Sequence, residues 1–168
     1  METIAVYWEE KVQVYGITQK SGLCLLRLVF LQEHAEKWGD RISKMQESAV
    51  RFDFVSQQTI DTNMLEFLFT YEKDKHHAIY QQLDEWLNED DSAQVQEESD
   101  IDIVFLHGPH FQDRFGIAEG AFTALTLEGE IVLASGCAGT SMYVIIPGGH
   151  GEKAKQILTD TFHIPTSG

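Results

Sequence analysis

The sequence is poor in cysteine, in basic residues and in long apolar runs. It contains two cysteines, Cys24 and Cys137, and no CxxC pair. Both cysteines lie among apolar or small residues, which predicts reduced thiols in a cytosolic protein and small buried side chains, with no reactive centre. The pairs His76–His77 and His107/His110 have no cysteine close to them in the sequence, so no metal site is predicted.

Basic residues are outnumbered by acidic ones. The chain of 168 residues has 12 Lys and Arg against 27 Asp and Glu, a net charge of −15. Phosphates would be repelled, which argues against nucleic acid and against an anionic membrane surface as partners. The longest apolar run, 23–31, is too short to span a bilayer and contains Arg27. The opening METIAVYWEE lacks the basic and apolar regions of a secretory signal. We therefore expect a cytoplasmic protein.

The chain repeats one pattern. An apolar strand, a glycine-containing loop and a helix are expected over Val12–Leu31 and again over Ile101–Gly129. Two strand-like runs and a second amphipathic helix follow each copy, which indicates two sister modules. Each copy also places a backbone-rich loop at a helix start, where small anionic groups are readily bound.

The first module is expected to span 1–88. Its apolar alternation and helical spacing predict these elements in order: strands Thr3–Trp8 and Val12–Gly16, a helix from Gly22 to Trp38, strands Ala49–Gln58 and Met64–Tyr71, and a helix Asp74–Leu87. The acidic stretch 89–100 has almost no core-forming residues and is expected to be a linker between modules.

The second module is expected to span 101–168. Its predicted elements are a strand Ile101–His107, a helix Gly116–Glu128, strands Glu130–Ser135 and Ser141–Ile146, a helix Glu152–Phe162, and a short closing strand near Ile164. Strands with interleaved helices predict an α+β fold, a sheet covered by helices on one face.

Catalytic motifs are scarce. The run GGHGEK at 148–153 lacks the spacing of a phosphate-binding loop and the Ser or Thr after its Lys, so a glycine turn into a helix explains it. We find no combination of nucleophile, base and orienting group, and no cofactor motif. A stand-alone enzyme therefore has little support, and no cofactor is expected.

The segments FLHGPHFQDRFGIAEGAFTAL and SMYVIIPGGHGEKAKQILTDTFHI, with KVQVYGITQKSG and VRFDFVSQQ in the first module, resemble the ACT domain, a ferredoxin-like βαββαβ module. Two in tandem resemble the C-terminal regulatory region of aspartokinase, and the resemblance covers nearly the whole chain. The Pro-Gly usual at the family's helix start is Ser21–Gly22 here in the first module and Phe115–Gly116 in the second.

The resemblance implies an amino-acid effector, such as lysine or threonine, bound at the interface between modules. Loop backbone groups and the edge of the second strand would hold it. In the first module the implied effector-binding residues are Gln19, Ser21, Gly22, Leu23, Cys24, Asp53, Gln57 and Gln58. Asp53 is the expected partner of the effector ammonium, although it also fits the solvent side of an alternating strand. The equivalent second-module residues are His110, Asp113, Arg114, Gly116 and Ile117.

The expected function is allosteric regulation by an amino acid, with a homodimer formed through the ACT modules and a kinase catalytic domain as partner. The chain itself carries no phosphate-binding loop, so it would be the regulatory part of an aspartokinase, a phosphotransferase, or a free-standing relative. The alternative is a degenerate ACT tandem that serves only for dimerisation or interaction and binds no effector.

Overall fold

The structure, a computed structural model, describes residues 11–47, 50–108 and 116–165. The predicted strand Thr3–Trp8 lies outside these residues. The chain folds into two compact units. One runs from Lys20 to Asp102; the other combines the chain up to Gln19 with the chain from Ile103 onward. We call them the 20–102 unit and the terminal unit. The predicted modules 1–88 and 101–168 place these boundaries elsewhere, because they assign residues before Lys20 to the first module.

Strand β1, Gly16–Leu31, corrects the sequence prediction. A helix was expected from Gly22 to Trp38, but residues 23–31 pair in antiparallel register with β3, Leu23 opposite Glu72 and Leu31 opposite Met64. The helix begins only at Ala35. An apolar run buried on both sides shows no clean alternation, so its spacing fits a strand as well as a helix.

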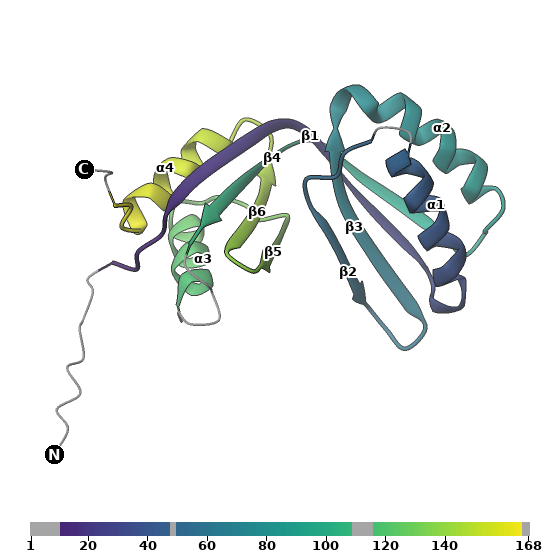
Figure 1. Cartoon of the computed structure of the whole chain (residues 1–168), viewed down its shortest axis with the longest axis horizontal. Coiled ribbons are helices and arrows are strands. Elements are labelled where there is room, and N and C mark those ends of the chain that lie inside the picture. Colours follow the sequence, from purple (N-terminus) through teal and green to yellow (C-terminus); the bar gives the residue numbers. More distant parts are fainter. Residues whose placement is uncertain (1–10, 48–49, 109–115, 166–168) are drawn as a thin grey trace, which may run out of the picture. The chain divides into compact units, whose positions relative to one another are not determined.

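The 20–102 unit holds a complete βαββαβ order. After β1 come the short 3-10 turn η1 (Gln32–His34), α1 (Ala35–Glu47), β2 (Val55–Thr59), β3 (Met64–Glu72), the turn η2 (Lys73–Lys75), α2 (His76–Leu87) and the first part of β4 (Gln94–His107). The strand order is β2-β3-β1-β4, with β1–β3 and β2–β3 antiparallel. Both helices cover one face of the sheet (Figure 1). Residues 94–100, predicted as linker, are therefore strand.

The core of the 20–102 unit lies between that face and its helices. Trp38, Ile42 and Met45 are buried at helical spacing on α1, and Ile79 and Leu83 on α2. The sheet contributes alternate residues of β1 and β3, namely Cys24, Leu26, Leu28, Phe30, Leu65, Phe69 and Tyr71. The amphipathic pattern of α1 continues past Trp38, so the helix includes Gly39 and ends only at Glu47.

A buried carboxylate links the two helices of this unit. Asp90 follows α2 and accepts hydrogen bonds from Trp38 Nε1 at 2.9 Å and from His34 Nδ1 at 2.8 Å. The backbone N–H of Ser92 donates to its other oxygen at 3.1 Å, and the Ser92 hydroxyl donates to it as well. Burial alone would raise the pKa of Asp90, but the bonds from Ser92, Trp38 and His34 outweigh it and lower the pKa to about 2.

The terminal unit contains the start of β1, the end of β4, α3 (Ile117–Leu127), β5 (Ala134–Ala138), β6 (Ser141–Pro147) and α4 (Gly151–Thr161), with strand order β1-β4-β6-β5. Helices α3 and α4 lie on one side of its strands (Figure 1). The chain beyond α4 pairs in parallel with the residues before β1: Val14 N donates to His163 O at 2.9 Å, and His163 N to Val12 O at 3.0 Å.

Each unit thus combines an antiparallel pair of strands with two helices, and the predicted α+β fold of ferredoxin-like modules is confirmed. The predicted helices of the second module agree with α3 and α4 to within a residue, while β5 begins at Ala134 and not at Glu130. In the described residues no helix is both long enough and apolar enough to cross a membrane.

Candidate functional site

Asp53, the predicted partner of an effector ammonium, already forms an ion pair with the side-chain ammonium of Lys20. Lys20 Nζ lies 2.8 Å from Asp53 Oδ2 and 3.0 Å from Glu72 Oε1. The hydrogen bond to Asp53 is the largest influence on Lys20 and raises its pKa, while the bond from Lys20 lowers the pKa of Glu72. One ammonium thus serves two carboxylates, and Lys20 occupies the position that the sequence analysis assigned to a ligand.

The other first-module residues are spread along β1 and β2. Gln19 donates to Glu152 Oε2 at 2.7 Å within the terminal unit. Ser21 and Gly22 are exposed, and Gly22 has φ +75°, a conformation that favours glycine. Leu23 and Cys24 are buried. None of these residues begins a helix, so the expectation that they form a helix N-terminal anion site was wrong.

The second strand does present an open edge. β2 is the outermost strand of the 20–102 unit, and Gln57 and Gln58 are exposed on it. Gln58 Nε2 donates a hydrogen bond to Glu66, which also accepts a hydrogen bond from Arg27 of β1. Glu66 itself is buried, so this row of side chains ties β2, β3 and β1 together on one face of the sheet.

The second-module residues are only partly described. His110, Asp113 and Arg114 lie outside the described residues. Gly116 stands immediately before α3 with φ +88°, which supports a glycine there, and Ile117 is buried in the core of the terminal unit.

Helix α1 begins at Ala35, thirteen residues beyond the predicted start at Gly22. Leu31, Gln32 and Glu33, with Asn63 from the β2–β3 turn, line a hollow of about 200 Å³. Gln32 N donates to Asn63 O at 2.7 Å, and Asp61 Oδ1 accepts the N–H of Asn63 at 2.8 Å. The turn is therefore fixed by its own hydrogen bonds. The Glu33 side chain is 76% exposed beside it.

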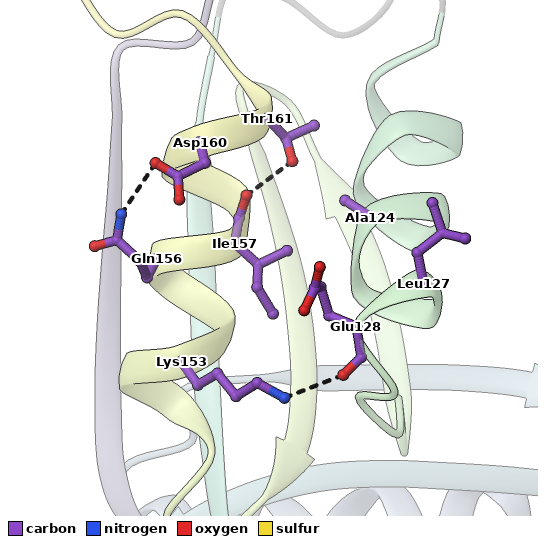
Figure 2. A pocket seen from close by; sticks show the side chains of 8 residues that line it. All are labelled: Ala124, Leu127, Glu128, Lys153, Gln156, Ile157, Asp160 and Thr161. Atoms are coloured by element: carbon purple, nitrogen blue, oxygen red, sulfur yellow. Dashed lines mark hydrogen bonds between the residues drawn. The ribbon is translucent and has the colours of Figure 1, made fainter.

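The terminal unit has a groove between α3 and α4 with a volume of about 490 Å³. Figure 2 shows Lys153 reaching from α4 to the carbonyl of Glu128 (3.0 Å), and Ile157 pointing from α4 toward α3. Among the predicted site residues that the structure describes, none lines this groove. Close to it, Glu130 is buried and pairs with His150 Nδ1 at 2.8 Å and Lys153 Nζ at 2.7 Å. Burial would raise the pKa of Glu130, but these partners lower it.

The fold gathers a further polar cluster that the sequence analysis missed. Cys24 of β1, His76 at the start of α2 and Glu97 of β4 bring a thiol, an imidazole nitrogen and a carboxylate oxygen within 4.8 Å of one another. Tyr71, which lies opposite Cys24 in the β1–β3 register, donates to Glu97 Oε2 at 2.7 Å. The three residues are more than twenty positions apart, so only strand pairing could have revealed the cluster.

These features define a tandem ferredoxin-like fold. Among solved structures the chain is similar to the regulatory subunit of aspartate kinase from Thermus thermophilus, with 18% identity and a TM-score of 0.77 over 89% of this chain and 99% of the other. The regulatory subunit from Thermus flavus gives 18% identity and 0.79 over 90% and 99%. Aspartate kinase from Synechocystis gives 13% identity and 0.80 over 95% of this chain and 29% of the kinase.

The predicted resemblance to the regulatory region of aspartokinase is thereby confirmed at the level of the fold. No protein-family model matches the sequence, and no curated protein matches it either.

Proposed function

We propose that this chain is an allosteric regulatory domain pair that binds an amino acid, such as lysine or threonine, and passes the signal to a kinase catalytic domain. The observation that carries the proposal is the extent of the fold likeness. The chain and the aspartate kinase regulatory subunits from Thermus cover each other almost completely. Binding would act by favouring one arrangement of the modules over another.

We place the effector in the hollow at the β1–α1 junction of the 20–102 unit. Its volume of about 200 Å³ is roughly that of six or seven water molecules in the liquid, which suits a small zwitterion. The start of α1 attracts the effector carboxylate, because helix N-termini carry partial positive charge. Glu33 offers its carboxylate to the ammonium. Asp53 is less suited to that role, since Lys20 already neutralises part of its charge.

The edge of β2 supplies the second half of the proposed site. An effector held between two copies of this unit would meet side chains of an edge strand, and Gln57 and Gln58 are exposed on this one. Val55 and Ile60 are each 48% exposed at the ends of the same edge. An exposed edge with apolar residues is a surface for pairing with a second copy, so we propose a homodimer through β2.

A thermal-shift screen of the full chain against the twenty amino acids tests the proposal. A ligand at a hundredfold excess over its Kd stabilises a protein by about 2.7 kcal/mol. We expect lysine or threonine to raise the melting temperature, Glu33→Gln to reduce that shift, and Glu36→Gln, an exposed acid one turn further on, to leave it unchanged. If Asp53→Asn abolished the ligand-induced shift in melting temperature and Glu33→Gln kept it, Asp53 and not Glu33 would bind the effector ammonium. If no amino acid changes the melting temperature, the effector proposal is wrong.

A second function is dimerisation without any effector. The Lys20–Asp53–Glu72 cluster favours it, because the Lys20 ammonium can take the place of an effector ammonium beside Asp53. Sedimentation equilibrium separates the two. This alternative predicts a dimer whose association is unaffected by any amino acid and weakened by Val55→Lys, which puts a charge on the β2 edge.

A further inference from the structure

The cluster of Cys24, His76 and Glu97, which we call the thiol cluster, belongs to neither proposed effector site. It lies wholly within the 20–102 unit. Two of its members are on neighbouring strands, β1 and β4, and the third is the first residue of α2. The sheet and the helix thus position the three groups independently of any loop.

The distances fit a tetrahedral metal. Zinc lies about 2.3 Å from a thiolate sulfur and about 2.0–2.1 Å from an imidazole nitrogen, so neighbouring ligand atoms are roughly 3.3–3.7 Å apart. His76 Nδ1 is 3.1 Å from Glu97 Oε2, and all three ligand atoms lie within 4.8 Å. Small side-chain rotations would close the remaining difference, with a water molecule as the fourth ligand.

The charges also fit. Cys24 is 1% exposed and the Glu97 side chain 11%, so a thiolate and a carboxylate here are largely withdrawn from water. Burying two negative charges is unfavourable, but a divalent cation between them makes the group neutral. Burial raises the pKa of the Cys24 thiol in the metal-free protein, and coordination to a cation reverses that preference. The His76 side chain is 48% exposed, which gives the ion a path of entry.

A second layer of side chains holds the ligands. Tyr71 donates to Glu97, and the ring of His76 stacks on that of Tyr80 with centroids 4.5 Å apart. Burial raises the pKa of Tyr80, and a hydrogen bond to Glu97 raises it further. Both phenols hydrogen-bond to Glu97 and so orient its carboxylate, as the outer partners of metal ligands do.

We propose that Cys24, His76 and Glu97 form a zinc-binding site in the 20–102 unit. A thiolate with an imidazole selects zinc over magnesium or calcium, which prefer oxygen ligands. The ion would join β1, β4 and the start of α2, and so stabilise this unit when it is bound. Tyr71 is a positioning residue for Glu97.

The test is a Co²⁺ titration of the full chain, reduced and freed of metal by a chelator. Cobalt bound to a thiolate gives a near-ultraviolet charge-transfer band. We expect the band to saturate at one equivalent and to disappear when Zn²⁺ is added. It should be absent in Cys24→Ser and unchanged in Cys137→Ser, the matched control at the exposed cysteine.

Histidine variants give the same test without altering a buried position. His76→Ala should weaken Co²⁺ and Zn²⁺ binding by at least about tenfold, and the neighbouring His77→Ala should not. Tyr71→Phe, which keeps the ring, should weaken binding by about 10–100-fold. Far-UV circular dichroism of each metal-free variant confirms that it is folded, and Zn²⁺ should raise the melting temperature of the wild type but not of His76→Ala.

Two results would overturn the proposal. One is a wild-type chain with no cobalt–thiolate band and no thermal shift with Zn²⁺. The other is a band that survives in both Cys24→Ser and His76→Ala, since the metal would then be bound elsewhere. In either case the thiol cluster would be a hydrogen-bonded part of the core and nothing more.

Discussion

Asp90 gives the sharpest prediction about stability. Its carboxylate is buried and accepts hydrogen bonds from Trp38, His34 and Ser92. Its pKa is lowered from 3.8 to about 2 in the folded chain. One pKa unit corresponds to about 1.36 kcal/mol, so the charged form stabilises the fold by about 2 kcal/mol relative to the protonated form. Asp90→Asn keeps the shape and removes the charge, and should lower the free energy of unfolding at pH 7 by about that amount.

The sign of the pH dependence follows from the lowered pKa. Stability from Asp90 is fully present above its unfolded pKa near 3.8 and is lost as the pH falls through about 2. Urea unfolding followed by tryptophan fluorescence should show the gap between wild type and Asp90→Asn closing between about pH 5 and pH 1. Other acids cancel in this difference. Asp91→Asn, at the exposed neighbour, should stay within about 0.5 kcal/mol of wild type. Equal stability of Asp90→Asn and wild type at pH 7 would refute the reasoning.

Four more substitutions test the fold. Glu130→Gln should lower the free energy of unfolding in urea by about 1–3 kcal/mol, because Glu130 is buried with charged partners. Since the pKa of Glu130 is lowered in the folded chain, its contribution to stability should fade as the pH drops through that pKa. A loss below about 0.5 kcal/mol at pH 7 would contradict the predicted role of Glu130. Gly22→Ala should lower the stability by about 1–2 kcal/mol, because the φ of Gly22 is +75°. Gly39→Ala should raise the stability by up to about 1 kcal/mol, because Gly39 lies inside α1 and nothing is close to the added methyl group. Thermal scans in which the two melting temperatures shift in the same direction would be evidence against these placements. Leu106→Ala should cost about 2–5 kcal/mol from the cavity it leaves, and a smaller loss by calorimetry would argue against its burial.

The sequence predicted the elements whose periodicity is clear. α2, α3, α4, β3 and β6 have one apolar face or a short apolar run between turn residues, and the structure places them within two residues of the prediction. The run 23–31 was misassigned as helix, because Leu23, Leu26 and Phe30 fit helical spacing while every residue between them is also apolar or long-chained. Pairing with β3, which decided the outcome, is a long-range property.

The acidic segment 94–100 was also misassigned, because its structure depends on a long-range strand neighbour. Its composition is typical of a solvated tether, yet it forms the first half of β4 because β1 offers an edge for it. Both errors affected the candidate site. The predicted helix start at Gly22 became strand, and the thiol cluster, which depends on β1 and β4 being neighbours, was not visible in the sequence.

We propose that the 20–102 unit binds an amino-acid effector at the β1–α1 junction. The most direct measurement is a ¹H–¹⁵N NMR titration of the full chain with lysine and, separately, with threonine. We expect saturable shifts with one of them, largest for the amides of residues 31–35 and 63, with smaller changes along β2. Spectra that stay unchanged with both amino acids at millimolar concentration, or shifts confined to other parts of the chain, would contradict it.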